Sequence, residues 1–291
     1  MIKSMLWILT IIITLLAAYY QRKTGPTHPR KVLVTVNDSV YKLNMVRSIA
    51  LNDRSEVKLK ITDPSVKANL FFKRLGIEEE FQISEFQYKE YPVESFLMNK
   101  VFHITKEKGL FAELPPQPAA GKLQYFIEIT DSKGTQSLFK DSPIVIRYKG
   151  GVPSYILVPH VLIMFVAMLF STLAGLMAMV KMPLYKQYAL WTLILLTAGG
   201  MILGPLVQKY AFDELWTGVP FGWDLTDNKT LISYLFWILA VYMNRKKDKP
   251  IYTIIAAFIL LLVYSIPHSL FGSELDYTSG KVTQGMTMIF F

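Results

Sequence analysis

The stretch YILVPHVLIMFVAMLFSTLAGLMAM, residues 155–179, decides the fold class of this chain. It contains no charged side chain, and about 20 consecutive apolar residues are enough for an α-helix to cross the hydrocarbon core of a bilayer. Further apolar runs lie at roughly 5–20, 187–208, 230–243 and 251–267. Hydrophobic residues make up 52% of the chain, and its mean hydropathy is +0.32. The sequence therefore predicts a membrane protein in which each of these runs is a transmembrane segment.

Two short connectors between the later apolar runs predict the orientation of the chain. KMPLYK (181–186) and NRKKDK (244–249) are basic and almost free of acidic residues. The positive-inside rule places such connectors in the cytoplasm, so residues 21–152, the loop 209–229 and the C-terminus face the other side. In a bacterium, this arrangement describes an inner-membrane protein with a cytoplasmic N-terminus and a periplasmic central segment.

The first apolar run allows two interpretations. Lys3 precedes it, as a basic residue precedes the apolar core of a secretory signal. However, the bulky Tyr19 and Tyr20 follow the alanines where a cleavage site needs small residues. We favour a retained transmembrane anchor over residues 1–22, with a cleaved signal as the alternative.

Residues 28–150 have a different pattern, in which apolar and polar residues alternate. The alternating segments are KVLVTV, EVKLKIT, FQISEFQY, KLQYFIEI and PIVIRY, and turn signals such as VNDS, TDPS and TDSKG separate them. Alternation with period two and a turn every 8–12 residues or so is typical of an antiparallel β-sandwich. We predict that this sandwich is followed by a four-helix transmembrane bundle over 153–270 and a periplasmic tail over 271–291.

One stretch of this segment resembles a known class of domain. GLFAELPPQPAAGKLQYFIEITDSKG (109–134) is similar to the late strands of bacterial extracytoplasmic immunoglobulin-like and fibronectin-III-like domains. Those domains often show a strand, a proline-rich turn, an aromatic strand and then a D-x-x-G turn. The resemblance implies an immunoglobulin-like or fibronectin-III-like sandwich and specifies no ligand.

Composition and motifs exclude several classes of function. The net charge is +9, but many of the basic residues outside 28–150 lie in the short connectors, and no basic stripe with interleaved aromatics occurs, so nucleic acid is not a predicted partner. The chain has no cysteine, which excludes disulfides, thiolate metal sites, iron–sulfur clusters and covalently attached haem. None of the motifs G-x-S-x-G, H-E-x-x-H, Walker A or G-x-G-x-x-G is present. A redox carrier is therefore a better prediction than a turnover enzyme.

Two histidines near the ends of apolar runs are the candidate ligands. His160 and His268 each follow a proline, in VPH and IPH. At a rise of 1.5 Å per residue, His160 lies about 30 Å and His268 about 27 Å above the cytoplasmic boundary. Both imidazoles thus come to about the same depth, where an unpaired ionisable group is costly, and the prolines bend the helices and open space between them.

Paired imidazoles across a helix bundle are the arrangement that ligates b-type haem. The run TAGGMILGP (197–205) places Gly200 and Gly204 at the same level, where a flat macrocycle can lie against the backbone. The same spacing also suits tight helix packing. We keep three alternatives open, namely haem or metal ligation by His160 and His268, two separate structural histidines, and a proton relay or quinone pocket.

The loop 208–230 holds acidic and aromatic residues with glycine and proline between them, and this composition favours a compact turn. We expect Asp227 or Asn228 to be the N-cap of the following helix, and the aromatics to form an interfacial belt. Asp224, with Glu274 from the tail, is the predicted hydrogen-bond acceptor for a ligand histidine.

A second resemblance concerns the bundle. The runs VPHVLIMFVAML and SLFGSELDYTSGKVTQG look like small four-helix bacterial membrane domains that open with H-P-x-L-V-H-F-P and close with G-G-x-L-V-Y-x-H-G. The matching positions are His160, Gly272, Glu274, Leu275, Tyr277 and Gly280, while the opening motif has one histidine instead of two and Ser279 replaces the closing histidine. Members are often linked with c-type cytochromes and membrane redox reactions.

The resemblance implies a role in membrane redox reactions, and together with the paired histidines it leads us to predict a b-type haem-binding, electron-transfer component whose sandwich docks a periplasmic or membrane protein. The alternative is a non-enzymatic structural or assembly subunit of a membrane complex.

Overall fold

The computed structural model describes residues 2–93, 105–267 and 272–284. The described residues form two compact units, each treated separately below. The helical unit takes its residues from 1–26, 150–274 and 282–291, and the β-unit takes its residues from 27–149 and 275–281.

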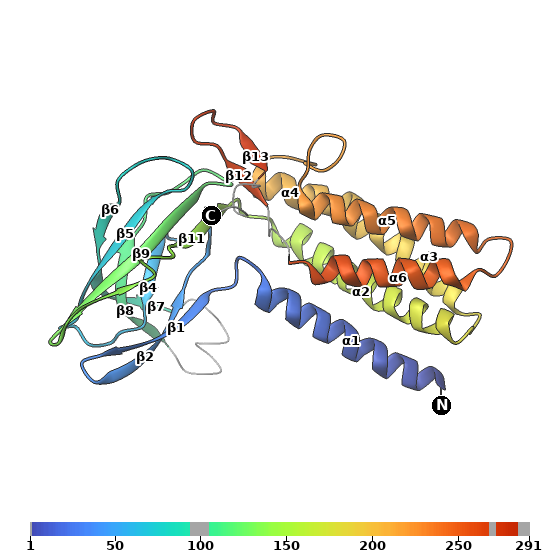
Figure 1. Ribbon diagram of the computed structural model, residues 1–291, viewed down its shortest axis with the longest axis horizontal. Helices are drawn as coiled ribbons and strands as arrows, with labels where there is room; N and C mark the ends of the chain where they lie inside the picture. Colours follow the sequence, from blue (N-terminus) through green and yellow to red (C-terminus); the bar gives the residue numbers. More distant parts are fainter. Residues whose placement is uncertain (1, 94–104, 268–271, 285–291) are drawn as a thin grey trace. The chain divides into compact units, whose positions relative to one another are not determined.

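The helical unit consists of six helices of α type and one of π type (Figure 1). These are α1 (Ile2–Thr24), α2 (Ser154–Met179), α3 (Tyr185–Leu196), the π-helix η2 (Thr197–Leu203), α4 (Gly204–Phe212), α5 (Leu225–Met243) and α6 (Pro250–Ser265). Within the described residues, three helices are long and apolar enough to cross a membrane, namely Ile2–Thr24, Ser154–Met179 and the run Tyr185–Phe212. The apolar helix α6 is shorter, and α5 is not among the three. Membrane association follows from these three helices, and the four-span bundle stays a prediction.

Small residues bring the helices of this unit together. The indole of Trp237 on α5 is fully buried in a cluster whose other members are mostly alanine and leucine. On α2, a Cβ added to Gly175 would lie 2.6 Å from the Cβ of Ala257 on α6. Glycine and alanine at such contacts allow the backbones to approach closely, which is how helices associate in lipid.

Helix α1 packs as part of the helical unit. Leu6, Thr10 and Thr14 are buried along one side of it. The ring centroid of Trp7 lies 6.4 Å from that of Phe170 on α2 and 5.9 Å from that of Tyr188 on α3, both in edge-on geometry. The segment predicted as a transmembrane anchor is therefore a helix that packs against α2 and α3.

Asn244 joins the helix ends on the side of the unit that holds the connectors 180–184 and 245–249. Its Oδ1 accepts hydrogen bonds from the hydroxyl of Tyr185 (2.6 Å) and from the backbone N–H of Lys249 (2.8 Å). Its Nδ2 donates to the carbonyl of Ala240 at 2.8 Å. Because Asn244 is buried and is the C-cap of α5, these bonds fix how α3, α5 and α6 meet.

The β-unit consists of short strands in three groups. The strands are β1 (Arg30–Val36), β2 (Ser39–Met45), β3 (Ser48–Ala50), β4 (Glu56–Leu59), β5 (Lys67–Arg74), β6 (Gln82–Glu85), β7 (Gln87–Pro92), β8 (Lys106–Glu113), β9 (Lys122–Asp131), β10 (Gly134–Leu138) and β11 (Ile144–Lys149). One sheet has the order β3-β11-β9-β5-β6 with β10 on β9, another has the order β4-β8-β7, and β1 pairs with β2. All pairs are antiparallel except β3 with β11. The strands predicted at KVLVTV, EVKLKIT, KLQYFIEI and PIVIRY are confirmed, whereas FQISEFQY is divided between β6 and β7, which pair in different sheets.

One hydrophobic core lies between these sheets. Leu70 on β5, Ile127 on β9 and Leu59 on β4 are fully buried and belong to the same cluster. Tyr125 on β9 is also fully buried, and its hydroxyl donates to the carbonyl of Val46 at 2.8 Å. The outward face of β9 and β5 therefore consists of the residues in between, such as 71 and 126.

A polar cluster ties the β1–β2 turn to two other loops. Asn37 and Asp38 have φ of 46° and 63°, as a two-residue hairpin turn requires. The backbone N–H of Asn37 donates to Asp131 at 2.9 Å, and its Nδ2 donates to Asp63 at 2.8 Å. Hydrogen bonds from Asn37 and Lys133 lower the pKa of Asp131, and those from Ser65 and Asn37 lower the pKa of Asp63.

Part of the C-terminal segment belongs to the β-unit. The hydroxyl of Tyr277 accepts from the backbone N–H of Lys122 at 3.0 Å and donates to the side-chain oxygen of Gln117 at 2.8 Å. Gly121 beside it has no room for a side chain, because an added Cβ would lie 3.0 Å from that hydroxyl. The segment predicted as one tail over 271–291 is thus divided, and its strands β12 (Ser273–Leu275) and β13 (Val282–Gln284) pair with each other.

Candidate functional site

His160 lies on α2 and is hydrogen-bonded to the π-helix. Its Nδ1 is 2.9 Å from the carbonyl oxygen of Gly199. A carbonyl oxygen only accepts, so Nδ1 carries the hydrogen, and in the neutral ring Nε2 keeps a lone pair. The wide turn of a π-helix interrupts the regular hydrogen-bond ladder and often occurs at functional positions. The end of the bundle that contains this contact is called the His160 end below.

The glycines of the π-helix give neighbouring helices room to approach. A Cβ added to Gly199 would lie 2.9 Å from Ile163 and 3.0 Å from the sulfur of Met164. A Cβ added to Gly200 would lie 3.0 Å from the methyl group of Thr230 on α5. Gly200, predicted as part of a surface for a macrocycle, is thus covered by a side chain, whereas Gly204 lies beside His160, with its added Cβ 3.9 Å from Cε1.

Lys229 is a buried cation at the same end that the sequence interpretation missed. It is only 4% exposed, and its Nζ donates to the carbonyl of Ile266, the C-cap of α6, at 2.8 Å. Together with Met164, Ser233 and residues around them, it lines a cavity of about 20 Å³. A volume of this size holds about one water molecule. The sequence feature that could have indicated it is a lysine one turn into an apolar helix. The sequence interpretation grouped this lysine with the capping residues of DLTDNKT.

Asp224 starts α5. Its Oδ1 accepts from the backbone N–H groups of Thr226 (2.8 Å) and Asp227 (3.2 Å), so Asp224 is the N-cap. The prediction that Asp227 or Asn228 is the N-cap is wrong. DLTDNKT contains three residues that could cap the helix. The hydrogen bond from the N–H of Asp224 to the carbonyl of Thr217, at 3.0 Å, holds Asp224 at the start of α5.

Asp227 and Asn228 instead hold the preceding loop. The Oδ2 of Asp227, which is 7% exposed, accepts from the N–H groups of Thr217 (2.6 Å) and Gly218 (3.1 Å). The side-chain oxygen of Asn228 accepts from the N–H of Val219 at 2.7 Å. Gly218 is required here, because an added Cβ would lie 2.6 Å from the Cβ of Asp227. The predicted compact turn is confirmed.

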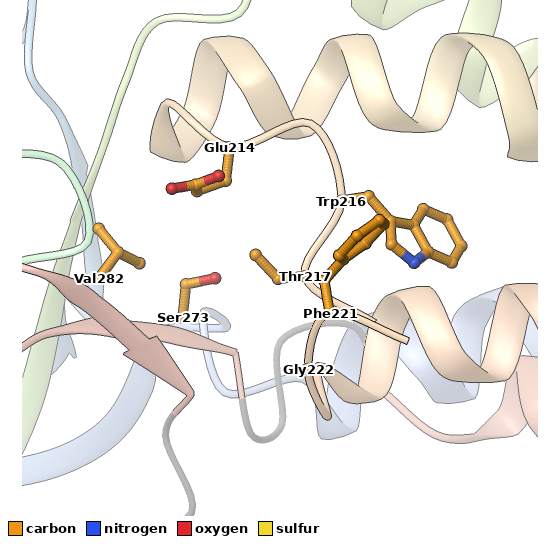
Figure 2. Close-up of a pocket in the computed structure, with 7 residues that line it drawn as sticks. All are labelled: Glu214, Trp216, Thr217, Phe221, Gly222, Ser273 and Val282. Atoms are coloured by element: carbon orange, nitrogen blue, oxygen red, sulfur yellow. The ribbon is translucent and has the colours of Figure 1, made fainter. Parts of the chain in front are cut away.

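This loop and the β12–β13 hairpin line an open pocket of about 390 Å³ (Figure 2). The loop contributes Glu214, Trp216, Thr217, Phe221 and Gly222, and the hairpin contributes Ser273 and Val282. Figure 2 shows the Glu214 carboxylate and the Ser273 hydroxyl on facing sides of the same gap. The Nε1 of Trp216 donates to the carbonyl of Val219 at 3.1 Å, which fixes the indole on the loop.

Two polar groups of this pocket have no partner among the described residues. Ser273 is 2% exposed, and no hydrogen bond is made by its hydroxyl within the described part of the chain. Glu214 forms no ion pair there, since the nearby Lys209 pairs with Asp213 at 2.8 Å. The pocket therefore presents a carboxylate and a hydroxyl with unused hydrogen-bonding capacity.

The remaining predicted site residues lie as follows. His268 is outside the described residues, so its pairing with His160 stays a prediction. Glu274 is buried in β12, and Asp224 is buried as the N-cap of α5. In the ranges that the structure describes, no group of three or more histidine or acidic side chains is arranged to hold a metal ion.

Compared with known proteins, the chain matches no protein-family model, no curated protein and no solved structure at a significant level. Its function is therefore argued from the residues alone.

Proposed function

We propose that this protein is a non-enzymatic assembly or adaptor protein of a bacterial inner membrane. Its apolar helices hold it in the bilayer, and its β-unit, on the periplasmic side, binds a partner protein. The observation that carries this proposal is a row of aromatic and aliphatic side chains on the side of the larger sheet that faces away from the core, in which Ile83 is exposed and Phe126 is buried beneath its neighbours.

The strand order supports an immunoglobulin-like fold for the β-unit. In immunoglobulin sandwiches, strands G, F and C are neighbours in one sheet, and strands B, E and D are neighbours in the other. In chain order, β11-β9-β5 corresponds to the first set and β4-β8-β7 to the second. On this proposal, β6 is strand C′ and the row lies on the face built from strands F, C and C′.

The row runs across three strands. Ile83 on β6 is opposite Phe71 on β5, and Phe71 is opposite Phe126 on β9, so their side chains share one face. The rings of Phe71 and Phe126 are stacked, with centroids 4.6 Å apart and planes 2° from parallel. Phe81 packs edge-on against Phe126 at 5.0 Å. Ile83, at the end of the row, is 60% exposed.

The surroundings of the row indicate the chemistry of the partner. The Nζ of Lys73 lies 4.8 Å from the ring centroid of Phe81, and that of Lys140 lies 5.8 Å from that of Phe126. A contiguous apolar surface with a polar rim is typical of a protein-binding site. Lys140 is already paired with Glu128 at 3.3 Å, so we propose a partner that places an apolar side chain on Ile83 and Phe71 and an acidic group against Lys73.

Site-specific cross-linking in native membranes tests this proposal. The chain has no cysteine, so Ile83→Cys supplies a unique thiol for a maleimide photo-cross-linker. Leu33→Cys is the matched control, because Leu33 is 69% exposed on β1 of the same unit. We expect one discrete adduct with a different protein from position 83 and none from position 33. No adduct, equal adducts at both positions, or only a dimer of this chain would contradict the proposal.

The second candidate function is electron transfer by a b-type haem ligated by His160 and His268. The hydrogen bond from Nδ1 of His160 to Gly199 favours it, because a ligand histidine usually donates its other ring N–H to a carbonyl and keeps Nε2 for the metal. Against it, the cavity beside Lys229 is only about 20 Å³, and Thr230 packs on Gly200, where a macrocycle was expected to lie. A haem in this place would therefore have to displace these side chains.

An optical spectrum separates the two candidates. The protein, purified in detergent from a haem-replete host, is measured oxidised and after reduction with dithionite. Absence of Soret and α bands excludes the haem proposal and leaves the adaptor proposal intact. If bands are present, the double variant His160→Ala, His268→Ala should lose them, and their persistence would contradict the ligand assignment.

A further inference from the structure

The pocket of Figure 2 has the composition of a site for a small cation that has an organic part. We propose that it binds a primary ammonium group, as a free amine or as the headgroup of an aminophospholipid. The inference is independent of the function proposed above, because it concerns the helical unit and uses none of the residues of the aromatic row.

The charge of the pocket selects a cation. Glu214 is the only charged residue among the described lining residues. Its neighbour Asp213 is engaged with Lys209, whereas Glu214 has no ion pair among the described side chains. Lys209 supplies one positive charge to Asp213 and Glu214 together, so this part of the pocket keeps a net negative charge that favours an ammonium group over an anion.

The buried hydroxyl selects a group with N–H donors. Ser273 lies across the gap from Glu214 and is 2% exposed, yet its oxygen has no partner among the described residues. The hydroxyl of Ser273 lines the pocket, so a bound group can donate a hydrogen bond to it there. A primary ammonium has three N–H donors, which suffice for the carboxylate and the hydroxyl together.

Aromatic rings complete the site. Trp216 and Phe221 come from the same loop, and Phe221 is 81% exposed, a large apolar surface to leave in contact with water. Cations are attracted to the faces of such rings, and the organic part of a ligand covers their surface. The volume of about 390 Å³ lies in the range of small-molecule sites.

The loop is held in place before any ligand arrives. Asp227 fixes the backbone of Thr217 and Gly218, and Asn228 fixes that of Val219. Trp216 is fixed in turn through its bond to Val219. Because these bonds already order the loop, binding costs little further conformational entropy.

Calorimetric titration of the full-length protein in detergent tests the proposal. Ethanolamine is the probe, and 1-propanol is its neutral counterpart of similar size. We expect saturable binding of ethanolamine and none of 1-propanol. Glu214→Gln should weaken binding at least tenfold and Ser273→Ala severalfold, while the control Asp131→Asn, which removes a carboxylate of the β-unit, should stay within twofold of wild type.

A second arm distinguishes the source of the ammonium group. The protein is placed in nanodiscs of phosphatidylglycerol with or without phosphatidylethanolamine, and the ethanolamine titration is repeated. Competition by phosphatidylethanolamine identifies a lipid headgroup, and its absence identifies a free amine. No saturable binding in either arm, equal binding of 1-propanol, or undiminished binding by a Glu214→Gln protein of unchanged melting temperature would overturn the proposal.

Discussion

Removal of the Asp227 carboxylate should release the loop 213–224 while leaving the helices in place. In Asp227→Ala, the N–H groups of Thr217 and Gly218 lose the oxygen that accepts them at 2.6 and 3.1 Å. A hydrogen bond to a charged group contributes about 1.5–3 kcal/mol to stability, and both donors lie within the folded loop. Two such bonds give a loss of about 3–6 kcal/mol in the local opening free energy of the loop.

Hydrogen exchange followed by mass spectrometry measures this loss directly. Each 1.4 kcal/mol is a factor of about ten in an opening equilibrium, so amides of peptides covering 215–219 should exchange roughly a hundredfold faster or more. Peptides from the middle of α2 should keep the wild-type rate, since α2 takes no part in these bonds. Ethanolamine binding should fall as well, because Trp216 and Glu214 lose their fixed positions.

Asp213→Asn is the matched control for this experiment. Asp213 is on the same loop, but its side chain is 88% exposed, and its ion pair within the described ranges is with Lys209. Its replacement should leave exchange of the loop unchanged within a factor of about three, since exposed ion pairs contribute about 0–1 kcal/mol. If Asp227→Ala and Asp213→Asn gave the same exchange rates, the argument that Asp227 orders the loop would be refuted.

Three further predictions concern other parts of the chain. Asn244→Ala should lower the stability of the helical unit by about 2–4 kcal/mol, seen as a lower melting temperature in detergent, because the buried hydroxyl of Tyr185 loses its acceptor. Asn244→Asp keeps this acceptor but places an oxygen against the carbonyl of Ala240, so it should not restore the melting temperature of wild type. Thr10→Val and Thr14→Val should leave the melting temperature unchanged or raise it, because both hydroxyls are buried without a partner among the described residues, whereas Thr10→Lys should lower it. The pKa of Asp131 is below its ordinary value of 3.8, so the stabilising effect of its carboxylate is present above that pH and is lost as the pH falls through the lower folded-state pKa. Circular dichroism from pH 6 to 2 should therefore show Asp131→Asn as less stable than wild type at neutral pH and less sensitive to acid.

The sequence predicted best those features that depend on periodicity. Alternation along KVLVTV and KLQYFIEI gives β1 and β9 because a half-buried strand repeats every two residues. The uninterrupted apolar run after Pro153 gives α2 for a similar reason, since length and hydropathy alone specify a helix long enough to cross a bilayer. These properties are local, so neighbouring elements cannot change them much.

The features that the sequence could not give depend on contacts between distant residues. The π-helix over Thr197–Leu203 has no distinct periodicity, and it is recognised only by the backbone and by the bond from His160 to Gly199. The choice of Asp224 as N-cap depends on the carbonyl of Thr217, seven residues earlier in the chain. Burial of Thr10 and Thr14 shows which side of α1 faces its neighbours, and hydropathy is silent on this because threonine is nearly neutral on such scales.

The two ends of the helical unit differ in whether their polar groups have hydrogen-bond partners, and this difference indicates where a ligand can bind. At one end, Asn244, Tyr185 and Lys249 satisfy one another, as expected where the role of polar groups is to hold helices together. At the His160 end, Glu214 and the hydroxyl of Ser273 face a pocket of about 390 Å³ without partners among the described residues. The unpaired hydroxyls of Thr10 and Thr14 do not alter this contrast, because neither residue lines that pocket. A binding site requires polar groups without partners and a cavity beside them. Within the described helical unit, both are found at the loop that Asp227 holds.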